Sequence, residues 1–124
     1  MNKSIQLRDY VLEDARDLAN IYYNTIHKIN IRDYNQQQVD VWAPKSSLEL
    51  EGWMKKWEKL KPIVAVINNK IVGFAEFNNQ TGYIDCFYCH HDYIGVGVGT
   101  SLMKAIDAKA KSNNIRRIYA DVSI

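Results

Sequence analysis

The chain has 124 residues, of which 47% are hydrophobic and 24% are charged, and its formal net charge is +2. This length and composition suit one hydrophobic core, so we expect a single domain over residues 1–124. The small net charge, without a run of basic residues, argues against nucleic acid as a partner. Because we find no apolar signal segment and no apolar run of membrane-spanning length, we expect a cytoplasmic protein that does not bind a membrane.

The first part of the chain predicts a strand, a long helix and a polar surface segment. Alternating apolar and polar residues predict a strand over 5–8. Acidic residues beginning at Glu13 suit the first turn of a helix, and apolar residues then recur at helical spacing up to Ile26. Residues 30–44 are polar, and we expect them to contain a short helical piece that ends near Pro44.

A second helix is expected after this segment. Ser46 and Glu49 fit a capping box, and the helix should end before Pro62. Trp53 and Trp57 lie at helical spacing, so we expect them to pack in the core. Three aromatic residues outside that spacing are candidates for the wall of a substrate site: Tyr23, Tyr34 and Trp42.

The middle of the chain predicts three consecutive antiparallel strands, 63–67, 71–77 and 83–89. Asn68-Asn69-Lys70 forms the first turn between them and Gln80-Thr81-Gly82 the second. A helix over 98–112 and a final strand over 116–123 follow. The strand at 83–89, this helix and the final strand form a β-α-β unit, whose right-handed crossover makes the two strands parallel. The expected fold class is therefore α+β, with a mixed, mostly antiparallel sheet and helices on both faces.

Three glycines at alternate positions, Gly95, Gly97 and Gly99, run directly into the helix at 98–112. Residues on one face of that helix follow i, i+4 spacing: Val98, Leu102, Ile106 and Ala110. Glycine lets another molecule approach the backbone, and the first turn of a helix offers unpaired N–H groups and the positive end of the dipole. The stretch is therefore interpreted as a phosphate-binding loop.

Cys86-Phe87-Tyr88-Cys89-His90 matches the C-x-x-C-H attachment pattern of c-type haem, and His91 adds a possible zinc ligand. In an extended strand, however, residues three apart point to opposite faces, so the two thiols cannot easily share a metal or a disulfide. We expect no haem and no metal. Both cysteines are interpreted as small hydrophobic residues.

The organisation of nearly the whole chain resembles the GNAT family of acetyl-CoA-dependent N-acetyltransferases. Phe87 to Leu102 is similar to the family's strand followed by (Gln/Arg)-x-x-Gly-x-(Gly/Ala), with Gly97 and Gly99 at the two small positions. Asp121-Val122-Ser123-Ile124 resembles the D-x-S-I of some small bacterial members. The resemblance implies a GNAT-like acyl-CoA N-acyltransferase fold. It also implies transfer of acetyl from acetyl-CoA to a primary amine of a small molecule or peptide by direct attack.

The resemblance also implies where coenzyme A would bind. The pyrophosphate would contact backbone amides of the following residues, with a hydroxyl from the last: Gly95, Val96, Gly97, Val98, Gly99 and Thr100. The pantetheine arm would pair with the backbones of Phe87, Tyr88 and Cys89. Ile94 stands where the family prefers Gln or Arg, and Val96 stands where a basic residue is common. Binding would then rest on backbone amides, and we expect a weaker affinity for coenzyme A than the full motif gives.

Acyl transfer to an amine also needs a proton acceptor. Asp85 is the first candidate, because a carboxylate buried among its strand neighbours beside the thioester would have a raised pKa. Glu76 is the second. The alternatives are that Asp85 is a hydrogen-bonded residue of the sheet and that Glu76 faces solvent. His90 and His91 titrate in the right pH range, but both sit at a strand end and could be surface residues.

Family members continue beyond the strand at 116–123, whereas this sequence stops at Ile124. The resemblance therefore implies a domain that is short at its C-terminus, and no general acid is named. An unpaired edge on the last strand favours a homodimer or strand exchange. A non-catalytic coenzyme A-binding or regulatory module is the alternative function.

Overall fold

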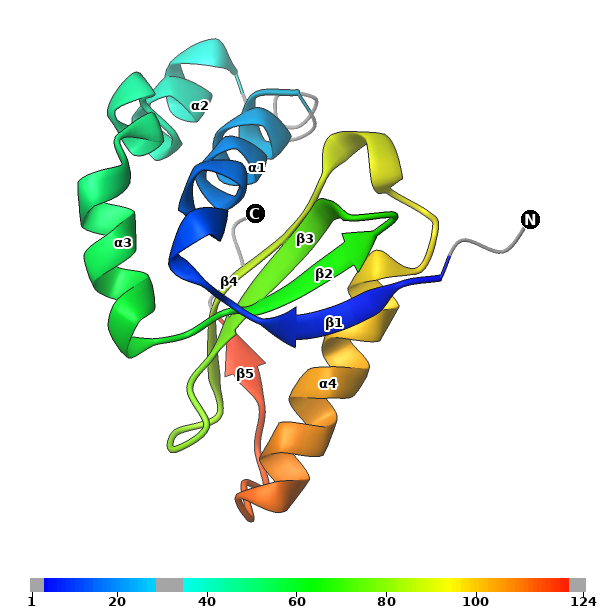
Figure 1. Ribbon diagram of the computed structural model, residues 1–124. Coiled ribbons are helices and arrows are strands. Elements are labelled where there is room, and N and C mark those ends of the chain that lie inside the picture. Colours follow the sequence, from blue (N-terminus) through cyan, green and yellow to red (C-terminus); the bar gives the residue numbers. More distant parts are fainter. Residues whose placement is uncertain (1–3, 29–34, 121–124) are drawn as a thin grey trace.

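The computed structural model describes residues 4–28 and 35–120, with the backbone alone described at Trp42. Its strands form one five-stranded sheet in the order β1-β2-β3-β4-β5 (Figure 1). The first four strands pair antiparallel and the last pairs parallel with β4. Their bounds are β1 Gln6–Asp9, β2 Ile63–Ile67, β3 Lys70–Phe77, β4 Tyr83–Cys89 and β5 Tyr119–Ala120. The mixed, mostly antiparallel sheet and the β-α-β unit expected from the sequence are confirmed.

The helices cover both faces of the sheet, as expected (Figure 1). Their bounds are α1 Ala15–Lys28, α2 Gln36–Trp42, α3 Leu50–Lys59 and α4 Val98–Ser112. In the described ranges, single turns of 3-10 helix accompany them at η1 Leu12–Asp14, η3 Lys45–Leu48 and η4 His91–Tyr93. The acidic residues expected in the first turn of α1 lie in η1 instead. Helices α1 and α3 pack on one face and α4 packs on the other.

Among the described residues, a large hydrophobic core lies on each face of the sheet, and a small third cluster joins Ile26 of α1 to Val39 and Ala43. Trp57 and Phe74 are fully buried in the core under α1 and α3, where Trp53 stacks on Trp57 with ring centroids 4.8 Å apart. On the other face, the residues predicted from i, i+4 spacing are all buried: Val98, Leu102, Ile106 and Ala110. Burial of this face at the first residue, Val98, fixes where α4 begins relative to the sheet.

A close approach between β3 and α4 depends on Gly73. A Cβ added at Gly73 would lie 2.7 Å from Cγ1 of Val98 and 3.1 Å from the carbonyl oxygen of Tyr88. A real Cβ does not approach other atoms this closely, so the absence of a side chain lets the first turn of α4 rest directly on the sheet.

The turn between β2 and β3 follows the sequence prediction. Asn68 and Asn69 have positive φ angles of 49° and 65°. Two consecutive positive φ angles are typical of the type I′ turn, which matches the twist of a hairpin and which asparagine tolerates better than most residues.

The capping box predicted at Ser46 and Glu49 is wrong. Ser47 donates its hydroxyl to the Pro44 carbonyl within η3, and Glu49 is the N-cap of α3 without a side-chain hydrogen bond. A capping box does form at α2, where Asn35 and Gln38 exchange side-chain and backbone hydrogen bonds of 2.8 and 3.0 Å.

The last strand begins at Tyr119, later than the predicted start at 116. Only Tyr119–Ala120 pairs with β4, and residues 121–124 lie outside the described residues.

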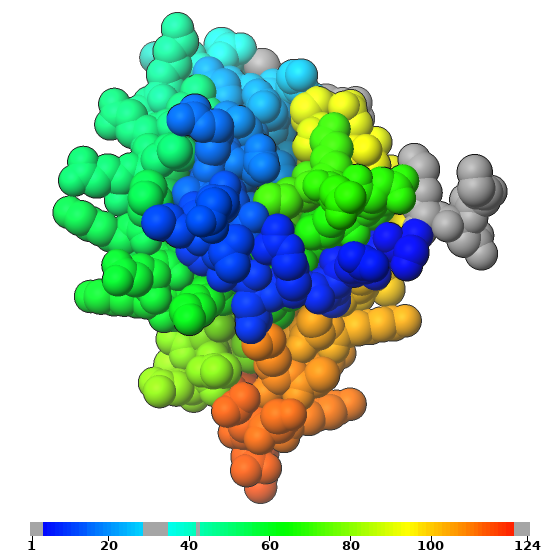
Figure 2. Space-filling model, in the orientation of Figure 1, coloured from blue at the N-terminus to red at the C-terminus, as the bar shows by residue number. Residues whose placement is uncertain are grey.

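The space-filling view shows β1 crossing one face of the molecule, with α3 to one side and α4 to the other (Figure 2). Among the described residues, no helix combines the length and the apolar character needed to cross a membrane.

Candidate active site

The segment between β4 and α4 carries the predicted phosphate-binding loop. Gly95 and Gly97 have positive φ angles of 85° and 94°, a conformation that residues with a side chain rarely adopt. Gly97 is the N-cap of α4, and a Cβ added at Gly95 would meet nothing within 4 Å. The loop therefore leaves open space beside the N–H groups of a helix N-terminus, and this arrangement fits the phosphates of coenzyme A.

The other residues of the predicted loop differ in how far their side chains are buried. Val98 is buried, so only its backbone can face a ligand, whereas the side chains of Val96 and Thr100 are exposed. Gly99 lies inside the first turn of α4. The Thr100 hydroxyl is therefore the side-chain group of this loop that can reach a phosphate oxygen.

Among the described residues, one edge of β4 is paired over only part of its length. Residues 87–89, predicted to pair with pantetheine, pair with β3 along one edge. On the opposite edge β5 reaches only Tyr83 and Ile84, and in the described ranges 4–28 and 35–120 no strand continues that pairing beyond Ile84. An extended ligand could add to this part of the strand by main-chain hydrogen bonds. At the end of β4, the Cys89 carbonyl accepts a hydrogen bond of 2.9 Å from the Thr25 hydroxyl of α1.

A bulge interrupts β4 where β5 ends. Ile84 pairs with Phe77 and Cys86 pairs with Glu76, so Asp85 is an extra residue without a partner on β3. Because of this extra residue, Asp85 and Cys86 face the same side of the sheet, beneath α3. The bulge thus brings the Asp85 carboxylate to the same face as Glu76.

Lys56 of α3 joins these carboxylates into one cluster. Its Nζ lies 2.7 Å from Oδ2 of Asp85 and 3.1 Å from Oε2 of Glu76. The same ammonium is 3.8 Å from Sγ of Cys86 and 5.5 Å from the centroid of the Trp53 ring. Two carboxylates, one ammonium and one thiol are therefore clustered on the face of β4 that lies beneath α3.

The environment of Glu76 differs from the solvent-facing position considered for it. Glu76 is 1% exposed, and Oε2 of its carboxylate forms an ion pair with the Lys56 ammonium at 3.1 Å. Both oxygens of the carboxylate lack a hydrogen-bond donor among the described residues. A buried polar group without its hydrogen bonds is uncommon and costly, which makes Glu76 a candidate for a functional role.

The environment of Asp85 also differs from the prediction. Its side chain is 39% exposed and paired with Lys56, so the expected burial among Tyr83, Ile84 and Phe87 is wrong. The bulge is the physical reason, because it turns Asp85 toward α3 while Ile84 and Phe87 pack on the α4 side. Asp85 is nevertheless the carboxylate of this pair that a ligand can reach from solvent.

The cluster perturbs the pKa values of its own members. Burial opposes the charge on Lys56, but its contacts with Asp85, Cys86 and Glu76 outweigh burial and raise the pKa of Lys56 well above its ordinary value. Burial, reinforced by the neighbouring Glu76 carboxylate, also raises the pKa of the Cys86 thiol. Lys56 is therefore a stable ammonium and Cys86 a neutral thiol at neutral pH.

A groove of about 380 Å³ lies beside Lys56, between η3 and α3. Its lining residues are Pro44, Ser46, Ser47, Glu49, Gly52, Trp53 and Lys56. Lys56 both lines the groove and contacts the two carboxylates. A molecule bound in the groove would therefore contact one side chain of the cluster. Of the aromatic residues predicted for a substrate wall, Tyr23 does not line this groove, and Tyr34 and the side chain of Trp42 lie outside the described structure.

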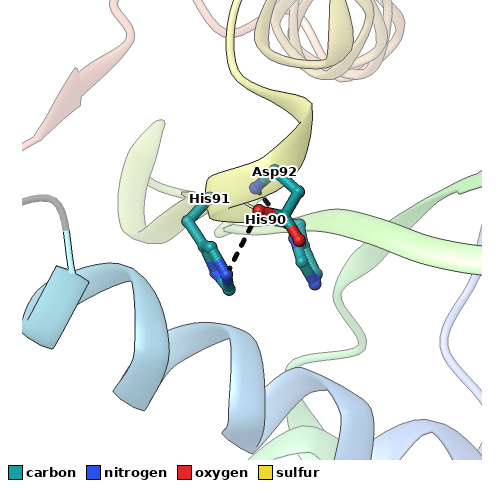
Figure 3. A group of neighbouring side chains, drawn as sticks. All are labelled: His90, His91 and Asp92. Atoms are coloured by element: carbon teal, nitrogen blue, oxygen red, sulfur yellow. Dashed lines mark hydrogen bonds and ion pairs between the residues drawn. The ribbon is translucent and has the colours of Figure 1, made fainter.

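The histidines at the end of β4 form a separate group with Asp92 (Figure 3). His90 and His91 stack with ring centroids 4.5 Å apart, and Nδ1 of His90 accepts a hydrogen bond from the Asp92 backbone N–H. Nε2 of His91 lies 3.4 Å from both Oδ1 of Asp92 and Nζ of Lys28. A lysine at this distance disfavours a bound cation, and these histidines lie apart from the Lys56 cluster.

The two cysteines occupy opposite faces of β4, as the strand interpretation predicted. Cys86 packs in the core under α1 and α3, and Cys89 packs against the core under α4. Both are free thiols. The C-x-x-C-H pattern thus does not bring its two sulfurs together, and it cannot present them to one haem or one metal in this conformation.

The profile of the Acetyltransferase (GNAT) family matches residues 23–124. The chain belongs to this family. A curated GNAT relative, the uncharacterized N-acetyltransferase YafP of Escherichia coli, is 29% identical over 103 residues. That match covers 83% of this chain, which spans 65% of the length of YafP.

Solved structures agree with this assignment. A GCN5-related N-acetyltransferase from Rhodopseudomonas palustris superposes with a TM-score of 0.88 and 29% identity, covering 99% of this chain and 76% of the other. The PaiA N-acetyltransferase of Thermoplasma acidophilum, solved with coenzyme A, gives a TM-score of 0.71 at 17% identity and covers 90% and 75% of the two chains. At that identity the likeness concerns the fold.

Lys56 is a residue of the candidate site that the sequence analysis did not single out. It lies three residues after Trp53 and one before Trp57, on the helix face that packs against the sheet. A lysine on an otherwise inward-facing stripe is a signal for a buried carboxylate partner, because a buried ammonium needs an opposite charge. Its neighbour Lys55 points outward and pairs only along the helix, with Glu51 at 3.7 Å.

Proposed function

We propose that this GNAT protein transfers the acetyl group of acetyl-CoA to a primary amine of a small molecule or peptide. One observation carries the proposal: two carboxylates and an ammonium gather beside β4, the strand that leads into the phosphate-binding loop. The strand would thus connect a site for the coenzyme to a site for the amine.

The loop would hold the coenzyme through its backbone. The amides at Gly95 and Gly97 and the first turn of α4 would bind the pyrophosphate, and the hydroxyl of Thr100 would add one contact. Ile94 and Val96 present exposed apolar side chains, so no side-chain cation assists at these two positions. Backbones of residues 87–89 would pair with the pantetheine arm.

The carboxylates would act on the amine. A primary amine arrives mostly as an ammonium and must lose a proton before its lone pair can attack the thioester carbonyl. Asp85 is reachable from solvent, so we assign it the role of proton acceptor, directly or through a water. Glu76 lies behind it, 1% exposed, and would position Lys56 and hold negative charge in the site.

Release of free coenzyme A thiol from acetyl-CoA in the presence of an amine panel tests this proposal. We expect Asp85→Asn to lower kcat/KM by about 10²–10⁴-fold, the usual contribution of a general base. Asp107→Asn is the matched control, because Asp107 is an exposed acid on α4, and we expect it to keep wild-type activity. Coenzyme A binding without turnover of any amine would instead favour the non-catalytic module.

A further inference from the structure

We infer that a second groove, between η1 and α3, binds a neutral and largely apolar carbonyl compound. The carbonyl oxygen of this ligand would accept hydrogen bonds from the indole N–H of Trp57 and from the hydroxyl of Tyr10. This groove shares no lining residue with the groove beside Lys56, so the inference does not depend on acetyl transfer.

The groove between η1 and α3 has the size and the surface of a small-molecule site. It lies where the segment after β1 passes α3 (Figure 1), and its volume is about 750 Å³. Val11 and Leu12 line it from η1 and its N-cap and are 48% and 57% exposed, while Met54 and Trp57 line it from α3. Burial of these apolar side chains under a ligand would favour binding.

Two polar groups in this lining have no hydrogen-bond partner among the described residues. They are Nε1 of Trp57 and the hydroxyl of Tyr10, and the two residues are 0% and 8% exposed. Their rings lie side by side, with centroids 5.6 Å apart. Buried polar groups are usually hydrogen-bonded, so two neighbouring ones without partners in the lining of one groove are candidates for contact with a ligand.

The chemistry of the two groups defines the polar part of the ligand. An indole N–H can only donate a hydrogen bond, so the ligand must bring an acceptor. Burial, reinforced by the nearby Asp14 and Glu13, raises the pKa of Tyr10, so its hydroxyl also keeps a proton to donate at neutral pH. A carbonyl oxygen has two lone pairs and can accept from two donors.

The charges around the groove favour a ligand without charge. Its lining carries as many lysines as acids, namely Lys55, Lys61, Glu51 and Glu58. Close to the unpartnered hydroxyl, the charges of Asp14 and Glu13 act on Tyr10 and would repel a carboxylate placed there. A neutral acceptor avoids this repulsion and gives up less hydration on entering an apolar groove.

Access to the two groups requires movement of side chains but not of the backbone. Both unpartnered atoms are covered by other atoms, so a ligand must displace a neighbouring side chain to reach them. Met54, Lys55 and Lys61 line the groove with unbranched, flexible side chains. A change of rotamer in such a side chain would open the groove while α3 stays in place.

Proton–nitrogen correlation NMR of the wild-type chain tests the inference with three probes. Acetophenone carries the carbonyl, α-methylstyrene has a methylene in place of the carbonyl oxygen, and benzoate carries a charge. We expect acetophenone to bind at least about tenfold more tightly than either of the others, because only it satisfies both donors without charge. Acetophenone should also move the Trp57 indole proton signal downfield of its position with α-methylstyrene, whose similar ring controls for ring-current effects.

The opposite results are equally clear. Equal binding of acetophenone and α-methylstyrene would mean that the groove is merely apolar, and tighter binding of benzoate would mean that it selects an anion. Each of these results would overturn the inference, as would an unmoved Trp57 signal or the absence of acetophenone binding.

Tyr10→Phe tests the second donor. The hydroxyl has no partner among the described residues, so its removal costs no hydrogen bond there and the variant should fold. We expect the Kd of acetophenone to rise by about fivefold to tenfold and the Kd of α-methylstyrene to stay unchanged. Tyr23→Phe is the matched control, because Tyr23 lies on α1 outside the lining of the groove, and it should keep the wild-type Kd. An unchanged Kd of acetophenone in Tyr10→Phe would contradict the inference.

Discussion

Gly97 is the residue on which the phosphate-binding loop depends most. Its φ of 94° places it in the left-handed region at the start of α4, where a larger residue costs roughly 1–2 kcal/mol and turns the following N–H groups away. We expect Gly97→Leu to abolish coenzyme A binding in a calorimetric titration.

A matched variant in the same loop separates this effect from a general loss of structure. Val96 has a negative φ and an exposed side chain, so Val96→Ala should keep the wild-type affinity. Unchanged affinity in Gly97→Leu would remove the phosphate-binding loop from the proposal.

His90 gives the molecule a pH-dependent element near the same loop. Burial, with His91 and Lys70 nearby, lowers the pKa of His90 below its ordinary value of 6.5. Between the lowered pKa and pH 6.5, the unfolded chain binds more protons than the folded chain. The contribution of His90 to stability is therefore complete above pH 6.5 and decreases as the pH falls toward the lowered pKa. Protonation of Nδ1 would also end its hydrogen bond from the Asp92 N–H.

Urea unfolding between pH 7 and pH 5 measures this contribution. We expect the free energy of unfolding to fall less steeply with decreasing pH in His90→Asn, whose side-chain oxygen can still accept the Asp92 N–H. Identical slopes for the variant and the wild type would contradict the assignment to His90.

At the scale of single residues, the sequence predicted acidic candidates but not their surroundings. Asp85 and Glu76 were singled out because carboxylates near the expected thioester are suited to proton transfer, and their catalytic role stays a prediction. The burial expected for Asp85 was wrong, and the solvent-facing alternative for Glu76 is not what the structure shows. The bulge that places Asp85 and Cys86 on the same face of the sheet could not be predicted from simple alternation. Lys56 is indistinguishable from Lys55 by composition, and only the docking of α3 on the sheet makes it a partner.

Among the elements, the contact between β3 and α4 is the least tolerant of change. Gly73→Ala would place a methyl group 2.7 Å from Val98, and overpacking of this kind costs about 1–3 kcal/mol. Because Val98 begins α4, we also expect the affinity for coenzyme A to fall. Denaturant unfolding and calorimetry measure the two effects.

Gly52 supplies the matched control for this prediction. It lies inside α3, and a Cβ added there would meet nothing within 4 Å. Gly52→Ala should therefore raise the free energy of unfolding by about 0.5–1 kcal/mol, through helix propensity alone. Stabilisation by both alanine variants would mean that the space at Gly73 is not limiting.

Elements defined by local chemistry were predicted well. The Asn68-Asn69 turn and the buried face of α4 follow from φ preferences and from i, i+4 spacing, and both are confirmed. The capping box at Ser46 failed because η3 uses the serines for its own turn, a choice that depends on how Pro44 directs the chain. A motif of a few residues can be replaced by another local structure, such as a 3-10 turn. A long stretch with regular apolar spacing is a more reliable signal.

At the scale of the whole molecule, the sheet has β1 and β5 at its edges. The Tyr119 N–H donates to the Gly82 carbonyl at 3.0 Å, so the N–H of the next residue, Ala120, is expected to point to the opposite edge. That edge has no strand partner among residues 4–28 and 35–120. We expect the 124-residue chain to associate through it, with a mass above that of the monomer in light scattering.

Ala120→Pro tests this expectation without removing the pairing of β4 with β5. Proline lacks the outward N–H and is tolerated on an edge, so the variant should be monomeric. A wild-type chain that stays monomeric at high concentration would contradict the expectation. The fold class itself was predictable from the order of the elements, because the right-handed crossover leaves few arrangements for these strands.

The bulge in β4 has a consequence for how the site could arise or be lost. Asp85 is the surplus residue, so a chain from which its codon was deleted would still place Ile84, Cys86 and Phe87 on their present faces. Loss of a codon from residues 87–89 would instead turn the remainder of the strand over. The more exposed acid of the candidate site thus lies at the surplus position of β4, which can be deleted without changing the faces of its neighbours. A deletion there would change the chemistry of the site and leave the sheet as it is.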